Sequence, residues 1–258
     1  MTESSDYSEK KSFFDKVLTV YGRKAVLETL QNETLVCHAL HLAHSNREAG
    51  IVADIRQRAQ LLGIPVKIHS REELARISKS GKQDQGVAVD VLCPSFSNLE
   101  DFLAKRTDQL CRLLALDGIT NPQNLGMIIR SAAAGAVDGI LLPRKGSAAL
   151  GPLVIKASAG TLYRAPLLLC AGLPEALRQC QEHGAQVCTL ESYAPLSLFQ
   201  HEARGFCVYV LGNETEGVSA QVSAIADTRL SIPMRNGVES LNVAVTASLI
   251  AYGTYLER

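Results

Sequence analysis

Residues 121–126, with the sequence NPQNLG, are followed by Arg130, and together they could form an anion-binding site. The first asparagine can cap a helix, and Pro122 suits a first helical turn. Gly126 and Ala134 occupy the positions four residues before and after Arg130, so no carboxylate at those positions pairs with it. Its guanidinium is therefore available for a phosphate or an alkoxide. The plainer alternative is a capped helix with a solvated arginine.

A second segment, residues 212–217 with the sequence GNETEG, directly follows an apolar run at residues 206–211. A dinucleotide-binding loop would read G-x-G-x-x-G, but Glu214 occupies the position of its middle glycine. A carboxylate there would repel a pyrophosphate, which excludes a dinucleotide site. The carboxylate suits a cationic or amine-bearing ligand, or else it holds a neighbouring loop by hydrogen bonds.

A third segment, residues 232–245, has the sequence IPMRNGVESLNVAV. Ser240 is a favourable N-cap for the helix that we expect at residues 240–257. This helix is apolar nearly all round, which predicts burial against its own sheet and against a partner subunit. Asn242, in its first turn, is an unusual choice for packing alone.

The elements around these segments decide whether they meet. In the second half of the chain we expect strands at residues 113–116, 139–142, 165–169, 185–189, 206–211 and 229–232, separated mainly by helices at 122–134, 151–157, 174–183, 219–226 and 240–257. Such alternation predicts an α/β domain with a parallel sheet and helices on both faces. Ligands bind beyond the carboxyl ends of the strands in such sheets, and all three segments follow expected strands.

The first half of the chain predicts a smaller α/β domain. We expect helices at residues 17–31, 47–62 and 71–77, with Gly63 ending the second, and strands at 35–41, 65–69 and 87–92. Residues 94–98 are rich in proline, serine and asparagine and are the plausible linker. The expected organisation is a flexible tail at residues 1–15, a small domain at 16–93, a linker region at 94–110 and a second domain at 111–258.

Composition narrows the class of protein. The chain has 258 residues, enough for one large or two small domains, with 26 basic and 26 acidic side chains. This balance counts mildly against a nucleic-acid partner, although Lys10, Lys11, Lys16, Arg23 and Lys24 form a local basic patch. No apolar run reaches the roughly 18 residues of a membrane helix, and the polar start is unlike a signal peptide. We therefore expect a cytoplasmic protein without membrane partners.

Cysteine and histidine usage argues against metal and disulfide chemistry. The seven cysteines are widely spaced and include no C-x-x-C pair, so we expect buried, reduced thiols. The six histidines show no metal-ligand spacing, and we predict no metal site.

Taken together, the three segments resemble motifs of the SpoU (TrmH-like) RNA ribose 2′-O-methyltransferases, a family of the wider SPOUT class. The matching motifs are N-P-x-N-x-G-x-x-x-R at residues 121–130, L-G-N-E-x-x-G at 211–217, and I-P-M at 232–234 with S-L-N-V at 240–243. They stand in the family's order, and the resemblance covers about residues 113–256. Residues 156–160 look like the family's serine–glycine segment. Residues 21–26 and 85–87 look like the start and end of its small substrate-binding domain, which is similar to a ribosomal-protein fold.

The resemblance implies a deep trefoil knot in the C-terminal domain, with S-adenosylmethionine bound in the knot. It also implies a homodimer with each site near the subunit interface. The cofactor-binding positions that it implies are Leu211, Gly212, Ile232, Met234, Leu241 and Thr189.

The motif arginine of the family corresponds to Arg130, and the resemblance therefore implies a catalytic role for Arg130. Because an arginine has a pKa above about 12, we expect Arg130 to hold a phosphate and stabilise the developing alkoxide rather than act as a base. The residues expected to order it and the loop around the nucleotide are Asn124, Glu214, Ser240 and Asn242. No metal is required.

Two positions depart from the family's pattern. Ala136 stands where the family usually has glycine, with Gly135 one place earlier, and Ala244 stands where serine is common. The first change could shift the end of a helix slightly. Neither change touches the residues expected to do chemistry.

The expected substrate is RNA, with a guanosine of large-subunit (23S) ribosomal RNA first and transfer RNA second. Two other functions stay open. The chain could be an inactive RNA-binding or assembly factor with the same fold, although the intact Asn124, Arg130, Glu214 and Asn242 argue against it. It could also be a base-modifying SPOUT enzyme, but the sequence S-L-N at residues 240–242 favours the ribose.

Overall fold

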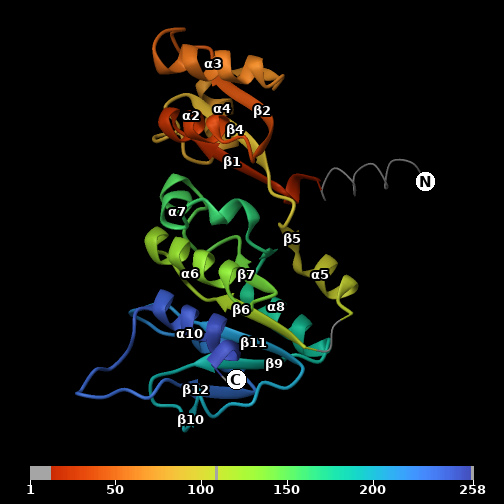
Figure 1. The fold of residues 1–258 in the computed structure, drawn as a ribbon, viewed down its shortest axis with the longest axis vertical. Coiled ribbons are helices and arrows are strands. Elements are labelled where there is room, and N and C mark those ends of the chain that lie inside the picture. The colour runs from red at the N-terminus through yellow and green to blue at the C-terminus, as the bar shows by residue number, and fades with distance from the viewer. Residues whose placement is uncertain (1–12, 108–109, 257–258) are drawn as a thin grey trace. The chain divides into compact units, whose positions relative to one another are not determined.

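The computed structural model describes residues 13–107 and 110–256 of the chain. It divides into two compact units, drawn in different colour ranges in Figure 1. The first unit extends to Pro94 and includes Leu150–Pro152, and the second comprises Ser95–Ala149 and the chain from Leu153 onward. No helix in the described ranges is long and apolar enough to cross a membrane.

The first unit is a four-stranded mixed sheet with three helices. Its elements are β1 (Val17–Tyr21), α2 (Arg23–Gln31), β2 (Val36–Ala43), α3 (Ile51–Leu61), β3 (Val66–His69), α4 (Arg71–Ser78) and β4 (Val87–Leu92). The strand order is β1-β4-β2-β3; β4 is antiparallel to both neighbours, and β2 and β3 are parallel. Helices α2 and α3 pack against each other, while Leu74 of α4 packs on the sheet at Ala43 and Ala88.

The start of this unit differs from the expected helix over residues 17–31. The structure has strand β1, then Gly22, then the shorter helix α2. Leu18 and Val20 are buried while their neighbours are partly exposed, which is the two-residue period of a half-buried strand. Gly22 has a φ of +88°, a non-helical conformation that ends the strand, so helix α2 begins only at Arg23.

The second unit contains an eight-stranded sheet in which every pairing is parallel, as the alternation of elements predicts. Its elements are β5 (Ser97–Asn98), α5 (Leu99–Lys105), β6 (Cys111–Leu116), α6 (Pro122–Ala134), β7 (Gly139–Pro143), α7 (Pro152–Ala157), η1 (Thr161–Arg164), β8 (Leu167–Cys170), α8 (Leu173–Glu182), β9 (Gln186–Leu190), β10 (Leu196–Ser197), β11 (Phe206–Leu211), α9 (Ala220–Ser223), β12 (Thr228–Ser231) and α10 (Val243–Leu256). The strand order is β10-β12-β9-β11-β6-β7-β8-β5.

Residues 94–110, expected as a linker region, contain structured elements of the second unit. Strand β5 pairs with β8 at the edge of the sheet, and α5 follows it directly. The Asn98 side chain caps α5 by accepting a hydrogen bond from the Asp101 backbone N–H at 2.7 Å. Leu99 is fully buried, so this helix is anchored in the core rather than being a free connection.

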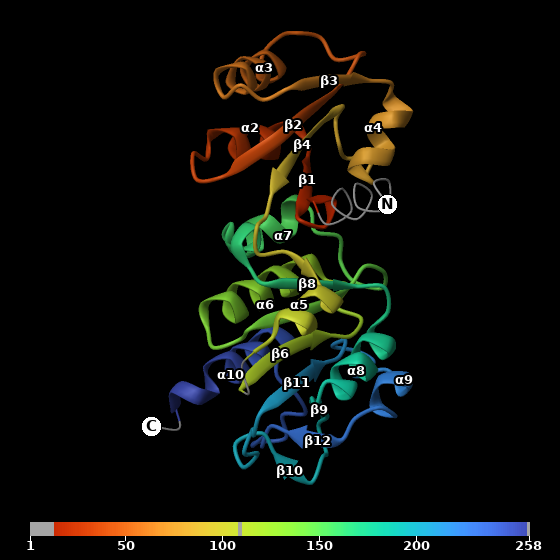
Figure 2. The ribbon, with the colours of Figure 1, turned by 90° about the vertical axis from the view of Figure 1, so that its right-hand side faces the viewer.

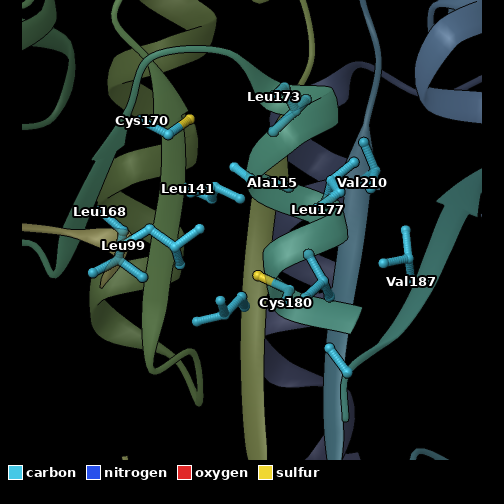
Figure 3. Close-up of a cluster of buried hydrophobic side chains, with 14 of the residues drawn as sticks. Leu99, Ala115, Leu141, Leu168, Cys170, Leu173, Leu177, Cys180, Val187 and Val210 are labelled. Atoms are coloured by element: carbon cyan, nitrogen blue, oxygen red, sulfur yellow. The ribbon is translucent and has the colours of Figure 1, made fainter. Parts of the chain in front are cut away.

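Helices cover both faces of the large sheet. Figure 3 shows Leu173, Leu177 and Cys180 of α8 in front of the strands, close to Ala115 and Val210. Helices α6 and α10 pack against each other, and α10 lies behind the strands in the same view. Figure 2 shows the same layers from the side, with α8 and α10 on opposite sides of β11. The sheet is therefore buried on both faces, as its nearly continuous apolar strands require.

Helix α6 has the predicted bounds, and two features of its sequence position it. The Asn121 side chain caps it by accepting a hydrogen bond from the Gln123 backbone N–H at 2.8 Å. A Cβ at Gly126 would lie 2.8 Å from the Val154 carbonyl oxygen and would overlap Ala157. Gly126 therefore lets the backbone of α7 approach α6 and does not open space for a ligand.

Helix α10 begins later than expected. It starts at Val243, and its cap is Asn242, whose Oδ1 accepts a hydrogen bond from the Ala244 backbone N–H at 2.9 Å. The expected cap, Ser240, lies in the exposed loop before the helix. Asparagine is as favourable an N-cap as serine, so the sequence alone could not decide whether the helix begins after Ser240 or after Asn242. Ala251 of α10 packs so tightly on Gly135 that a Cβ there would lie 2.6 Å from the Ala251 carbonyl oxygen.

All seven cysteines are free thiols, and six of them are buried. Burial raises the pKa of Cys93, Cys180 and Cys188 to about 12, and that of Cys37 and Cys170 to about 11. Such thiols are protonated near neutral pH, so they fill space as small apolar side chains.

Candidate functional site

A cavity of about 610 Å³ lies at the carboxyl ends of strands β9, β11 and β12. This volume is in the range of sites that enclose a small organic molecule. Its apolar lining comes from Leu190, Leu211, Leu230, Ile232, Met234, Leu241 and Val243, and its polar lining includes Glu191, Glu214, Glu239, Ser240, Asn242 and Thr246. The cavity therefore offers apolar walls together with carboxylates.

The strand order explains why distant segments meet here. Strands β12, β9 and β11 are consecutive in the sheet and parallel, so their carboxyl ends lie side by side. Five of the six positions that the resemblance gave to the cofactor line the cavity, namely Leu211, Gly212, Ile232, Met234 and Leu241.

Thr189, the sixth position, does not line the cavity. Its side chain is fully buried, and its hydroxyl donates a hydrogen bond to Glu191 Oε1 at 3.0 Å. It lies one residue before the end of β9, beside Val187 and Cys188. The sequence position was close, but Thr189 supports the cavity wall through Glu191 instead of forming it.

The loop after β11 is a tight turn that glycine makes possible. Asn213 and Gly217 exchange two backbone hydrogen bonds of 2.9 and 2.8 Å. A Cβ at Gly212 would overlap the backbone of Gly217, so this position requires glycine for the turn itself. The Asn213 side chain donates to the Gly118 carbonyl at 2.8 Å, which ties this turn to the loop after β6.

Three residues from three separate motifs form one hydrogen-bonded chain beside the cavity. Asn242 Nδ2 donates to Asn124 Oδ1 at 3.1 Å, and Asn124 Nδ2 donates to Glu214 Oε1. Asn124 is 8% exposed, so its amide needs these partners. The network fixes the start of α6, the start of α10 and the loop after β11 relative to one another, and it accounts for Glu214 in place of a glycine.

Arg130 and Ser240 lie outside this network. Arg130 is exposed and does not line the cavity, and its guanidinium forms no hydrogen bond or ion pair with any residue that the structure describes. It follows Asn124 by six residues, which is about 9 Å along a helix axis. Ser240 lines the cavity. No hydrogen bond or ion pair joins the Arg130 side chain to Asn124, Glu214, Ser240 or Asn242 of the same chain, so the expectation that these residues order Arg130 stays a prediction.

Arg130 instead belongs to an exposed surface shared by α6 and α10. The helices are joined there by a hydrogen bond from Ser248 Oγ to Ser131 Oγ at 2.8 Å. Large apolar side chains are exposed next to it. We call the surface formed by Met127, Arg130, Val245 and Tyr252 the α6–α10 face; its three apolar members are 41%, 48% and 40% exposed.

The residues that sequence reasoning missed are Glu191, Ser192 and Tyr193, which line the cavity directly after β9. Tyr193 is 90% exposed. The signal that could have found them is their place at the carboxyl end of a parallel strand, the same rule that identified the other loops. This strand was predicted, but its loop contains no glycine to draw attention to it.

A second polar cluster lies in the first unit, on one face of its sheet. Asp90 Oδ2 lies 3.0 Å from His41 Nε2, and Asp90 Oδ1 accepts a hydrogen bond from the Thr19 hydroxyl at 2.7 Å. Burial raises the pKa of Asp90, but the hydrogen bonds from His41 and Thr19 outweigh burial and lower it overall. His69 Nε2 lies 3.0 Å from His41 Nδ1, and burial followed by repulsion from His41 lowers the pKa of His69.

Within residues 13–107 and 110–256, no group of three or more histidine, cysteine, aspartate or glutamate side chains is gathered to hold a metal ion. The polar groups that line the cavity are carboxylates, amides, hydroxyls and backbone groups.

Comparison with known proteins agrees with the two units. A sequence model of the SpoU rRNA methylase family matches residues 112–252, and one for RNA 2′-O ribose methyltransferase substrate binding matches residues 19–92.

Two relatives and one solved structure extend the match over nearly the whole chain. An uncharacterized tRNA/rRNA methyltransferase of Mycolicibacterium vanbaalenii is 34% identical over 238 residues, which are 92% of this chain and 75% of that protein. The 23S rRNA (guanosine-2′-O-)-methyltransferase RlmB of Xylella fastidiosa is 31% identical over 243 residues, which are 93% of this chain and 96% of that protein.

The crystal structure of the SpoU methyltransferase AviRb from Streptomyces viridochromogenes, in complex with AdoMet, shares the fold with a TM-score of 0.62 at 18% identity, covering 94% of this chain and 91% of AviRb. The chain therefore belongs to the SpoU rRNA methylase family and is an RNA 2′-O-methyltransferase that uses S-adenosylmethionine.

Proposed function

We propose that this enzyme methylates the 2′-hydroxyl of a guanosine in 23S ribosomal RNA. The observation that carries the site is the hydrogen-bonded chain from Asn242 through Asn124 to Glu214, which joins the three motifs beside the cavity. The likeness to RlmB of Xylella fastidiosa, over 96% of that protein, supports the choice of RNA. Transfer RNA is the second candidate, since the relative from Mycolicibacterium vanbaalenii is named as a tRNA/rRNA methyltransferase.

The cavity residues fit S-adenosylmethionine in kind. Leu211, Ile232, Met234 and Leu241 offer apolar walls for a purine, and the tight turn at Gly212 exposes backbone groups at the cavity edge. The carboxylates in the lining suit a ligand that carries positive charge on its sulfonium and its ammonium. When bound, the cofactor supplies an electrophilic methyl group.

The residues of the chain supply positioning and charge stabilisation. The network around Asn124 holds the two loops and the start of α10 in fixed relation, which favours a reactive geometry for cofactor and RNA. Arg130 carries a permanently charged planar guanidinium that suits the phosphate and the developing alkoxide of the target ribose.

The position of Arg130 leads us to propose that it acts in the site of a second subunit. It lies on the α6–α10 face and not in the cavity of its own chain. The exposed Met127, Val245 and Tyr252 around it provide apolar area for a homodimer. In such a dimer, the start of α10 lies near both the cavity of its own chain and the interface. Sedimentation at micromolar concentration tests the dimer, and Val245→Glu should yield folded monomers.

Mass analysis of nuclease-digested RNA tests the function. Purified 23S ribosomal RNA and transfer RNA, both lacking ribose methylation, are incubated with the enzyme and labelled S-adenosylmethionine. We expect label in 2′-O-methylguanosine from ribosomal RNA. Label in a ribose of transfer RNA would select the second candidate, label on a base would refute ribose methylation, and no label in either RNA would support an RNA-binding factor without activity.

A further inference from the structure

Glu191 lies at a central position in the cavity wall. It directly follows β9, the strand between β11 and β12, whose ends carry Gly212 and Ile232. Its backbone N–H donates to the Leu230 carbonyl at 2.8 Å, which extends the pairing with β12 by one residue. Glu191 is thus held on the sheet between the two loops assigned to the cofactor, and it is one of the residues that line the cavity.

The Glu191 carboxylate is oriented by contacts that all converge on one oxygen. Oε1 accepts hydrogen bonds from the Thr189 hydroxyl at 3.0 Å and the Ser223 hydroxyl at 3.1 Å, and Arg229 Nε lies 3.6 Å from it. The other oxygen, Oε2, has no partner among the residues that the structure describes. The side chain is 31% exposed, so it is partly desolvated and fixed in orientation at the same time.

We propose that Glu191 Oε2 accepts a hydrogen bond from the ribose hydroxyls of S-adenosylmethionine. A carboxylate at the end of a parallel strand, beside the strand that carries a glycine turn, is well placed to hold a ribose diol. A hydrogen bond to a charged acceptor is stronger than a neutral one, and the fixed orientation reduces the entropy cost of forming it. This assignment rests on the proposed placement of the cofactor at the loops of Gly212 and Ile232.

The substitution Glu191→Gln tests the proposal with little change of shape. The glutamine Oε1 still accepts from Thr189 and Ser223, so the wall stays supported, but the free oxygen becomes an uncharged amide. Calorimetry measures the affinity of S-adenosylhomocysteine and of 5′-methylthioadenosine, which lacks the amino-acid part. We expect both affinities to fall by about 10-fold, the value of one charge-assisted hydrogen bond.

A ligand without the diol identifies the group that is recognised. The 2′,3′-dideoxy form of 5′-methylthioadenosine should bind the wild-type enzyme more weakly and bind Glu191→Gln no worse than the wild type, because the contact is already lost. Glu202→Gln is the matched control, since Glu202 is exposed, pairs with Arg204 and does not line the cavity.

Three results would overturn the assignment. Unchanged affinity of Glu191→Gln for both ligands would mean that the carboxylate does not meet the adenosine part. A loss confined to S-adenosylhomocysteine would place it at the ammonium, and an equal loss for the dideoxy ligand would place it at the base. Gly212→Val tests separately whether the cavity is the cofactor site. If the folded Gly212→Val variant binds S-adenosylhomocysteine normally, the cofactor lies elsewhere.

Discussion

Replacing Arg130 by lysine should remove catalysis and leave the fold intact. The guanidinium makes no hydrogen bond or ion pair in the described part of its own chain, and the side chain is exposed. We therefore expect the stability of Arg130→Lys to lie within about 0.5 kcal/mol of wild type. Lysine keeps the charge and loses the planar fork of donors.

The expected loss of turnover is at least about 100-fold, the usual effect of removing one positioned transition-state donor and equivalent to about 2.7 kcal/mol. Cofactor affinity should stay unchanged, because Arg130 is proposed to meet the phosphate and ribose of the RNA rather than the cofactor. Single-turnover transfer of labelled methyl groups to RNA measures the first quantity, and calorimetry with S-adenosylhomocysteine measures the second.

A mixing experiment decides which subunit uses the arginine. Arg130→Lys is co-expressed with Gly212→Val, which keeps Arg130 and has a disrupted cofactor loop. If Arg130 acts across the interface, half of the dimers contain both chains and one of their two sites is complete, so about a quarter of wild-type activity returns. If mixed dimers form and no activity returns, the arginine acts within its own chain. If Arg130→Lys alone turns over at nearly the wild-type rate, Arg130 is a solvated helix residue, and its proposed role in catalysis is refuted.

Three further substitutions test other parts of the structure. Gly212→Ala should weaken S-adenosylhomocysteine binding at least about 10-fold by calorimetry, because its Cβ overlaps the backbone of its own loop, whereas Gly172→Ala, whose Cβ meets open space, should bind normally. Asn242→Asp keeps the helix cap but cannot donate to Asn124, so we expect about 10-fold slower methylation; equal rates would remove the network from the mechanism. Asp90→Asn should destabilise the first unit by about 1–3 kcal/mol at neutral pH. Because the folded-state pKa of Asp90 is lowered, the stability difference between wild type and Asp90→Asn should shrink as the pH falls below the ordinary pKa of 3.8. Denaturant unfolding at several pH values measures it, and a difference in midpoint that stays constant with pH would contradict the assignment.

The predicted fold class was correct because its signal is local and repeated. The bounds of α6 and β11 match the structure, since a capped, proline-initiated helix and an uninterrupted apolar strand have few alternatives. The error at residues 17–31 has the opposite cause: Val17–Tyr21 forms a strand because it pairs with β4, a contact distant in sequence. The knot rests on resemblance and stays a prediction.

The candidate site could be predicted in content but only partly in arrangement. Motif positions identified the cavity loops, because each motif follows a strand. They could not show that Asn124 joins Asn242 and Glu214, because that contact depends on how α6 and α10 pack. Nor could they show that Arg130 lies away from the cavity, since a helix position gives direction only once the packing is known.

The protonated state of the buried cysteines makes this enzyme a convenient background for chemical labelling. At pH 7, a thiol with a pKa of about 11 or 12 is ionised in at most about one molecule in ten thousand. Only the thiolate reacts with alkylating reagents. A cysteine introduced at the exposed Tyr193 would therefore react far ahead of those native thiols. A fluorophore attached there would sit at the mouth of the cavity and could report cofactor entry in real time.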